Sequence, residues 1–208
     1  MWFLLALIAL VCWSGSDLFS KIGSKPDDKF SQWKMVVAVG LVMGVHAIVE
    51  IVFFKVPFSL KAMWTYLPAS LCYISSMFIG YIGLRYIELS ISSPICNTSG
   101  AFASLFLIVF FTDRAGIESQ TQLIMTIVGI IVCALGVTGL GFAEMSEDDE
   151  IRARRQETAN VKYSKSWLAL AIPVIYCFID AAGTVADSFI LDVLDEDVAN
   201  VAYELTFL

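Results

Sequence analysis

Several ionisable side chains stand inside long apolar stretches of the chain, and four of them are its first candidates for chemistry: Asp17, His46, Glu50 and Asp180. A charge surrounded by hydrocarbon is costly unless it faces a partner or a water-filled cavity, so such residues often mark a pathway for solutes or protons. His46 and Glu50 are four residues apart and share one face of a helix. An imidazole beside a carboxylate can hold a proton, but the same pair is equally compatible with an internal hydrogen bond that serves structure alone.

Asp17 and Asp180 differ in what surrounds them along the chain. Asp17 shares a helical face with Trp13 and with Lys21, so it can contact a substrate or reach with Lys21 toward the lipid headgroups. Asp180 lies near the middle of its stretch, on a face that also carries Tyr176. No basic residue of that stretch can pair with Asp180. Either another helix supplies its partner, or Asp180 lines a wet cavity where it binds substrate or titrates, and the cavity is the favoured interpretation.

Uncharged polar and aromatic residues complete the candidate set. Tyr73 and Tyr81 stand on one helical stripe with Met77, a pattern whose commoner meaning is packing. Tyr66 is expected in the aromatic belt at the membrane interface. Asn97 can hydrogen-bond a ligand or a neighbouring helix. The predicted substrate-binding or coupling residues are Trp13, Asp17, His46, Glu50, Tyr73, Tyr81, Asn97, Tyr176 and Asp180.

Several classes of function are disfavoured by what the chain lacks. It holds one histidine, and no HExxH, GxSxG, CxxC or Cys/His metal spacing occurs in it. We therefore predict no catalytic set, no metal and no cofactor, and we expect the five cysteines to be free thiols. The net charge of −7 argues against nucleic-acid binding, which needs a basic face.

Six apolar stretches must position these residues, at 2–22, 34–54, 63–86, 90–111, 121–142 and 167–191. A helix needs about 20 apolar residues to cross about 30 Å of hydrocarbon, and each stretch reaches that length. All 13 Lys and Arg residues lie between the stretches or at their ends, and 58% of the chain is hydrophobic. The predicted fold class is therefore an all-α, polytopic helical membrane protein that spans the lipid bilayer of the cell membrane several times.

Two segments carry a resemblance to a known family. Residues 80–114 read GYIGLRYIELSISSPICNTSGAFASLFLIVFFTDR, and residues 128–141 read VGIIVCALGVTGLG. The LRYIELSISSP junction, the Asp113–Arg114 pair that ends the fourth stretch and the glycine-spaced fifth stretch resemble the third to fifth helices of the EamA family. That family belongs to the drug/metabolite transporter superfamily, so the resemblance implies a transporter.

The resemblance also implies an organisation of the chain. Members typically have ten spans arranged as two five-helix inverted repeats, so we expect a first repeat at 1–143, a charged linker at 144–166, and the start of a second repeat at 167–208. The chain would then stop early in a seventh helix, and the polar face of the sixth would be exposed. Two departures leave the subfamily open, because the family usually has Glu where Asp113 stands and often Pro near Gly100.

The expected function is transport of small polar metabolites, amino acids or drugs by alternating access, with the site near the bilayer midplane. A non-transporting membrane subunit is the alternative, and a membrane-embedded enzyme is a less favoured one. The glycines of the fifth stretch predict a packing or dimer surface, so a homodimer is a further candidate assembly. Loop charge places the N-terminus outside the cytoplasm, because ten of the 13 basic residues lie on the opposite side. The resemblance implies the reverse, and the orientation stays open.

Overall fold

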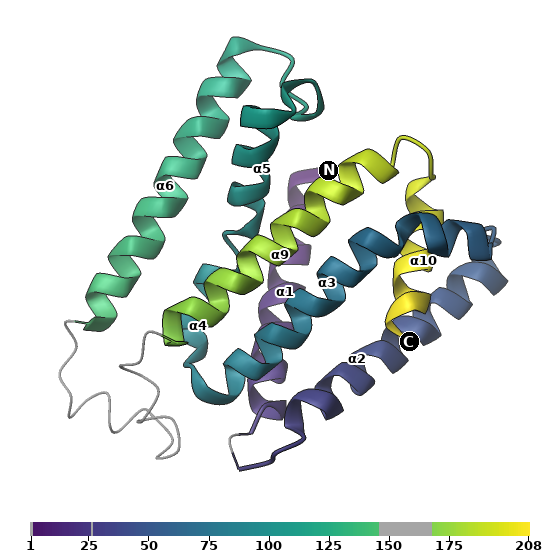
Figure 1. Cartoon of the computed structure of the whole chain (residues 1–208), viewed down its shortest axis with the longest axis horizontal. Helices are drawn as coiled ribbons and strands as arrows, with labels where there is room; N and C mark the ends of the chain where they lie inside the picture. Colours follow the sequence, from purple (N-terminus) through teal and green to yellow (C-terminus); the bar gives the residue numbers. More distant parts are fainter. Residues whose placement is uncertain (1, 26, 146–167) are drawn as a thin grey trace.

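The structure is a computed structural model, and it describes residues 2–25, 27–145 and 168–208. These residues fold into helices, which confirms the all-α fold class, and six helical segments are long and apolar enough to cross a membrane, as a multi-pass membrane protein requires (Figure 1). The elements are α1 (Trp2–Gly23), α2 (Ser31–Val49) continued by the π-helical turn η1 (Glu50–Phe54), α3 (Leu60–Tyr86), α4 (Leu89–Cys96), α5 (Ser99–Phe110), the 3-10 turn η2 (Thr112–Arg114), α6 (Gln120–Met145), α9 (Leu168–Ile190) and α10 (Glu196–Phe207).

The fourth predicted span is not one continuous helix, and this corrects the sequence-based expectation. A turn at Asn97 and Thr98 separates α4 from α5. Pro94, three residues earlier, lies inside α4 and has no N–H to donate to the Ser90 carbonyl, so this short helix lacks one of its bonds ahead of the break. Carbonyl groups at the break accept side-chain donors in addition to backbone N–H groups: the Asn97 amide donates to the Ser93 carbonyl at 2.9 Å, and the Thr98 hydroxyl to the Ile95 carbonyl at 2.7 Å. Irregular backbone at membrane depth is tolerated because such donors satisfy it.

The centre of the molecule is formed by α9, which lies beside α3 and runs in the opposite direction (Figure 1). Two glycines allow this close approach. A Cβ atom at Gly183 would lie 3.0 Å from the Tyr73 ring, and a Cβ atom at Gly80 would lie 3.2 Å from the Tyr176 ring. Small residues serve this purpose in membrane proteins, where packing rather than water drives helices together. The α3–α9 pair is therefore the framework on which the candidate site residues are placed.

The polar face of α9 is covered by α3, so the expectation that this face would be exposed is wrong. The Tyr66 hydroxyl donates to Asp187 at 2.6 Å, and the Ser76 hydroxyl donates to Asp180 at 3.1 Å. Tyr66 is only 6% exposed, so its ring packs inside the bundle, and its predicted place at the level of the membrane interface stays a prediction. A buried tyrosine needs a partner for its hydroxyl, and the neighbouring helix supplies a carboxylate.

The predicted seventh helix is α10, which packs against both α2 and α3. It begins after Asp195, whose carboxylate accepts a hydrogen bond from the Asp197 N–H at 3.1 Å and so caps the helix. Its small apolar residues fill two cores: Ala199 and Ala202 pack on α3, and Val201 packs on α2. These contacts hold α10 in the bundle although it is too short to cross a membrane alone.

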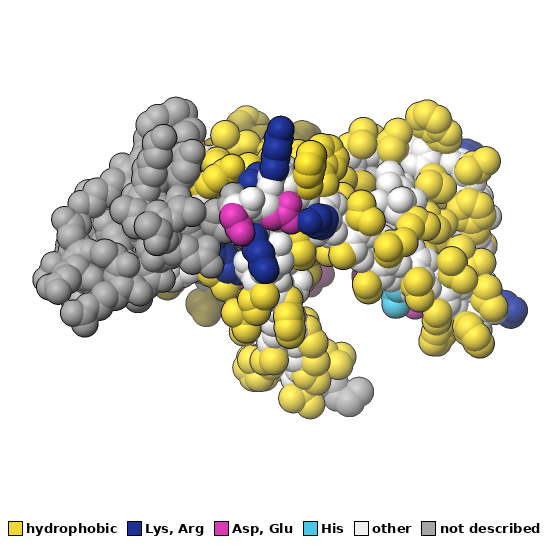
Figure 2. All heavy atoms as spheres, turned by 90° about the horizontal axis from the view of Figure 1, so that it is seen from below, with side chains coloured by type: hydrophobic (Ala, Val, Ile, Leu, Met, Phe, Trp, Pro, Cys, Tyr) yellow, Lys and Arg dark blue, Asp and Glu magenta, His cyan; other side chains and the backbone are white. Residues whose placement is uncertain are grey.

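Hydrophobic side chains cover most of the outer surface, as a lipid environment requires. Figure 2 shows the end of the molecule where α1 meets α2, with Lys, Arg, Asp and Glu gathered between hydrophobic flanks. The apolar part of α6 has no buried residue, and a Cβ atom added at Gly129, Gly136 or Gly139 would meet nothing within 4 Å. These glycines therefore pack against nothing in the described chain, and a dimer surface there stays a prediction.

The predicted division into 1–143, 144–166 and 167–208 stays a prediction. Helix α6 ends at Met145, so the first two residues of the predicted linker are helical, and 146–166 lie outside the described residues. The inverted-repeat plan stays a prediction.

Candidate functional site

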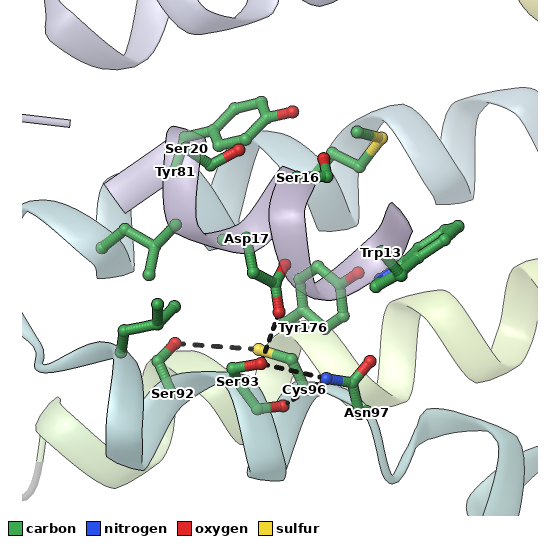
Figure 3. Close-up of a pocket in the computed structure, with 14 residues that line it drawn as sticks. Trp13, Ser16, Asp17, Ser20, Tyr81, Ser92, Ser93, Cys96, Asn97 and Tyr176 are labelled. Carbon is green, nitrogen blue, oxygen red and sulfur yellow. Dashed lines mark hydrogen bonds between the residues drawn. The ribbon is translucent and has the colours of Figure 1, made fainter. Parts of the chain in front are cut away.

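A cavity of about 70 Å³ lies between α1, α3, α4 and α9 (Figure 3), which is room for a few water molecules. It is lined by Trp13, Ser16, Asp17, Ser20, Met77, Gly80, Tyr81, Leu84, Leu89, Ser92, Ser93, Cys96, Asn97 and Tyr176. At about 1.5 Å per residue, its polar residues Asp17, Ser93 and Asn97 lie about 6–12 Å from the nearest ends of the spans Phe3–Gly23 and Leu89–Phe110. This lower cavity is inside the span, but it is nearer one end than the midplane site we expected.

A short chain of hydrogen bonds crosses the lower cavity from the broken helix to α1. The Ser93 hydroxyl donates to Asp17, and the Asn97 amide nitrogen lies 3.1 Å from the Ser93 oxygen (Figure 3). The break that follows Pro94 leaves Asn97 at the end of α4, so its side chain can turn back along that helix toward Ser93. Asp17 is the only charged residue among those that line the lower cavity.

Lys21, one turn further along α1, bonds to the end of α3, whereas one predicted alternative had it reach toward the lipid headgroups. Its ammonium group donates to the carbonyl oxygens of Leu84 and Ile87 at 2.7 and 3.0 Å. These carbonyls end α3, where the helix has no further N–H groups to offer and its dipole favours a cation. Lys21 and Asp17 thus attach α1 to the bundle at two polar points.

Three aromatic side chains from three helices line the lower cavity: Trp13 on α1, which is 60% exposed at its edge, Tyr81 on α3 and Tyr176 on α9. Tyr176 lies beside Asp17 in Figure 3, and its ring packs over Gly80. Five of the nine predicted site residues therefore line one cavity. They are Trp13, Asp17, Tyr81, Asn97 and Tyr176.

Two further predicted residues lie above the lower cavity, in the contact between α3 and α9. Asp180 accepts the Ser76 hydroxyl, so a neighbouring helix supplies its partner, and Asp180 is not among the residues that line the lower cavity. Tyr73 donates to the Thr184 hydroxyl at 3.4 Å. A second, upper cavity of about 290 Å³ follows, and it is lined by Tyr66, Asp187, Leu191, Glu196, Asp197, Ala199, Asn200 and Tyr203.

These polar groups lie one after another between the two cavities, and we call them the polar column. Tyr176 lies between its lower and middle parts, because it lines the lower cavity beside Asp17 and stands four residues before Asp180 on α9. From bottom to top the polar column consists of Asn97, Ser93, Asp17, Tyr176, Asp180, Ser76, Tyr73, Thr184, Asp187 and Tyr66.

The remaining predicted pair, His46 and Glu50, lies away from the polar column and gains a third member from α10. His46 Nδ1 lies 2.9 Å from both carboxylate oxygens of Glu204, and Nε2 lies 3.6 Å from a Glu50 oxygen. Glu204 is 7% exposed, so its carboxylate is buried against α2. The two carboxylates flank opposite ring nitrogens, so the three side chains cannot hold a single metal ion together.

The residues that sequence reasoning missed had weak signals. Ser93 stands four residues before Asn97, which places the two on one helical face. Glu204 is a lone carboxylate in a short apolar run that ends the chain. Ser76 carried no signal, because serine is common in membrane helices for packing alone.

The chemistry available in the polar column is hydrogen bonding and electrostatic attraction. Among the described residues, no group of three His, Cys, Asp or Glu side chains could hold a metal ion. All five cysteines are free, as the sequence predicted.

Comparison of the chain with protein-family models, with curated proteins and with solved structures finds no match. The geometry of the polar column is therefore the basis for a functional assignment.

Proposed function

We propose that this protein is an integral membrane transporter that moves small polar solutes along the contact between α3 and α9. The observation that carries the proposal is the polar column, which lies between the lower and upper cavities inside a molecule that exposes many large hydrophobic side chains. Polar and ionisable groups inside a membrane are expensive, and when they face the interior they typically mark a solute or ion pathway.

The two cavities suit alternating access better than an open channel. Between them, Tyr73 packs against Gly183 and Ser76 bonds to Asp180, so the polar column is closed in the middle. A carrier of this kind exposes its site to one side at a time through the movement of helices against each other. Helix α1 is a candidate for such movement, because most of its surface is exposed.

Two further features support a transporter of the EamA type. The broken span α4–α5 places side chains of a helix end at the lower cavity, as discontinuous helices do in many carriers. Helices α1 and α9 run in opposite directions (Figure 1), as the first helices of two inverted repeats would. Both features agree with the family resemblance in the sequence.

The proposal is tested by asking whether the lower cavity can be reached from both sides of the membrane. Cys96 lines this cavity and is a natural probe once the other four cysteines are replaced by serine. A membrane-impermeant thiol reagent is applied to right-side-out and to inside-out vesicles that contain this variant. A matched variant that keeps only Cys133, an exposed residue in the apolar part of α6, reports on leakage and on lipid-facing thiols.

A carrier predicts that Cys96 is labelled in both vesicle preparations while Cys133 is labelled in neither. A non-transporting subunit predicts labelling of Cys96 from one side at most, and that result would refute the proposal. Circular dichroism of both variants, compared with the unmodified chain, verifies that the helices are intact.

A further inference from the structure

The polar column has an unbalanced charge. It contains three carboxylates, those of Asp17, Asp180 and Asp187, and none of them forms an ion pair with a lysine or arginine of the described residues. Each receives one hydroxyl hydrogen bond from a neighbouring helix. A hydroxyl group orients a carboxylate but leaves its charge uncompensated, and an uncompensated charge is costly at this depth. The polar column therefore favours a positively charged occupant.

The lower cavity has the features of a site for such an occupant. Asp17 is its one charged lining residue, and the nearby ammonium group of Lys21 donates to the carbonyl oxygens that end α3. The Asn97 amide uses its nitrogen toward Ser93, which leaves its oxygen as an acceptor. A carboxylate and an amide oxygen together accept hydrogen bonds from an ammonium group and donate none.

The walls of the lower cavity point to the same ligand chemistry. Trp13, Tyr81 and Tyr176 supply aromatic rings, and cations are attracted to the faces of such rings, most strongly to tryptophan. The volume of about 70 Å³ admits only a small molecule. An anion would meet Asp17 with no lining cation to offset the repulsion.

The upper cavity would select for the same charge. Asp187, Glu196 and Asp197 line it together with the rings of Tyr66 and Tyr203. A cleft lined by charges of one sign raises the local concentration of ions of the opposite sign. The two ends of the polar column thus have matching electrostatic character.

We propose that the lower cavity binds a small organic cation with a primary ammonium group, with Asp17 as its counter-ion and Trp13 against its alkyl part. This inference rests on the proposed function, because it names the class of solute that the transporter would carry. The ammonium group would donate to Asp17 and to the Asn97 oxygen. A ligand of very few heavy atoms gains little total binding energy, so the expected affinity is millimolar.

The test measures binding directly and does not depend on transport. The whole chain is labelled with 5-fluorotryptophan and placed in lipid nanodiscs, and the fluorine spectrum is recorded during titration with three probes of similar size. The probes are ethylammonium, its neutral counterpart ethanol, and the anion acetate. The chain has five tryptophans, and a Trp13→Phe variant identifies the signal of Trp13.

Three variants locate the charge that matters. Asp17→Asn keeps the shape and the acceptor for Ser93 but removes the charge, whereas Asp17→Glu keeps the charge. Asp28→Asn makes the same chemical change in the loop between α1 and α2, outside the polar column. Unchanged signals from the other four tryptophans show that each variant is folded.

We expect saturable movement of the Trp13 signal with ethylammonium and none with ethanol or acetate. Asp17→Asn should weaken this binding about tenfold or more, because a hydrogen-bonded charge is removed, while Asp17→Glu and Asp28→Asn should bind within a few-fold of the unmodified chain. Equal binding of ethanol or acetate, or unchanged binding by Asp17→Asn, would overturn the cation assignment and leave the transporter proposal standing. No saturable response to any of the three probes would overturn the cation site, and labelling of Cys96 from both sides would still decide the transporter proposal separately.

Discussion

The hydroxyl of Tyr66 should hold the upper ends of α3 and α9 together, and its removal by Tyr66→Phe tests the helix pair on which the polar column is built. Tyr66 is 6% exposed, and its hydroxyl donates to Asp187 at 2.6 Å. Tyr203→Phe is the matched control, because Tyr203 lies at the same junction and, among the described residues, its hydroxyl bonds only to the sulfur of Met77, at 3.5 Å.

The expected magnitude follows from the two acceptors. A hydrogen bond to a charged group contributes about 1.5–3 kcal/mol to stability, but hydrogen bonds measured between membrane helices average about 0.6 and reach about 1.7 kcal/mol. Asp187 is half-exposed at the upper cavity, so water can replace part of what it loses. We therefore expect Tyr66→Phe to cost about 1–2 kcal/mol. A thioether is a weak acceptor, so Tyr203→Phe should cost less than about 0.5 kcal/mol.

Equilibrium unfolding by sodium dodecyl sulfate in mixed micelles, followed by circular dichroism, measures both free energies. A double-mutant cycle with Asp187→Ala isolates the pairwise coupling between the two side chains. Equal destabilisation by the two Tyr→Phe variants, or a coupling near zero, would mean that the hydrogen bond does not support the α3–α9 contact.

Three other substitutions test the packing, the buried carboxylate on α10 and the surface loop. Gly183→Leu should cost about 1–3 kcal/mol in the same unfolding assay, because it overfills the contact between α9 and α3; stability equal to that of the unmodified chain would contradict the close approach. His46→Ala should speed hydrogen exchange of the α10 amides selectively, because Glu204 loses its imidazole partner; uniform protection would show that apolar packing alone holds α10. The hydrogen bonds from the Lys34 ammonium and the Phe30 N–H lower the pKa of Asp28 below its ordinary 3.8. The small stabilisation by ionised Asp28 is therefore complete above the ordinary pKa of 3.8, and it is lost as pH falls through the lowered pKa of the folded state. Asp28→Asn should flatten the acid side of the curve of unfolding free energy against pH. Parallel curves for the variant and the unmodified chain would contradict this.

Much of the fold was accessible from the sequence, because the bilayer imposes a simple rule on it. Each helix that crosses hydrocarbon must be apolar over about 20 residues, and this requirement is local. The six spans were therefore predicted within three residues at their N-terminal and C-terminal bounds, apart from the break after Pro94 in the fourth. Five site residues that the structure brings to the lower cavity were also named from their type and position alone.

The partners of the polar groups were decided only by the tertiary structure. Lipid tails are as apolar as leucine, so the hydrophobic pattern of a span does not say which of its faces meets another helix. That choice depends on where small residues such as Gly183 let two helices approach, and on which hydroxyls then face which carboxylates. The contacts of Tyr66 with Asp187, Ser76 with Asp180, and Glu204 with His46 each join helices far apart in the chain. They exist because lateral packing brought those helices together, and no local signal in the sequence carries that information.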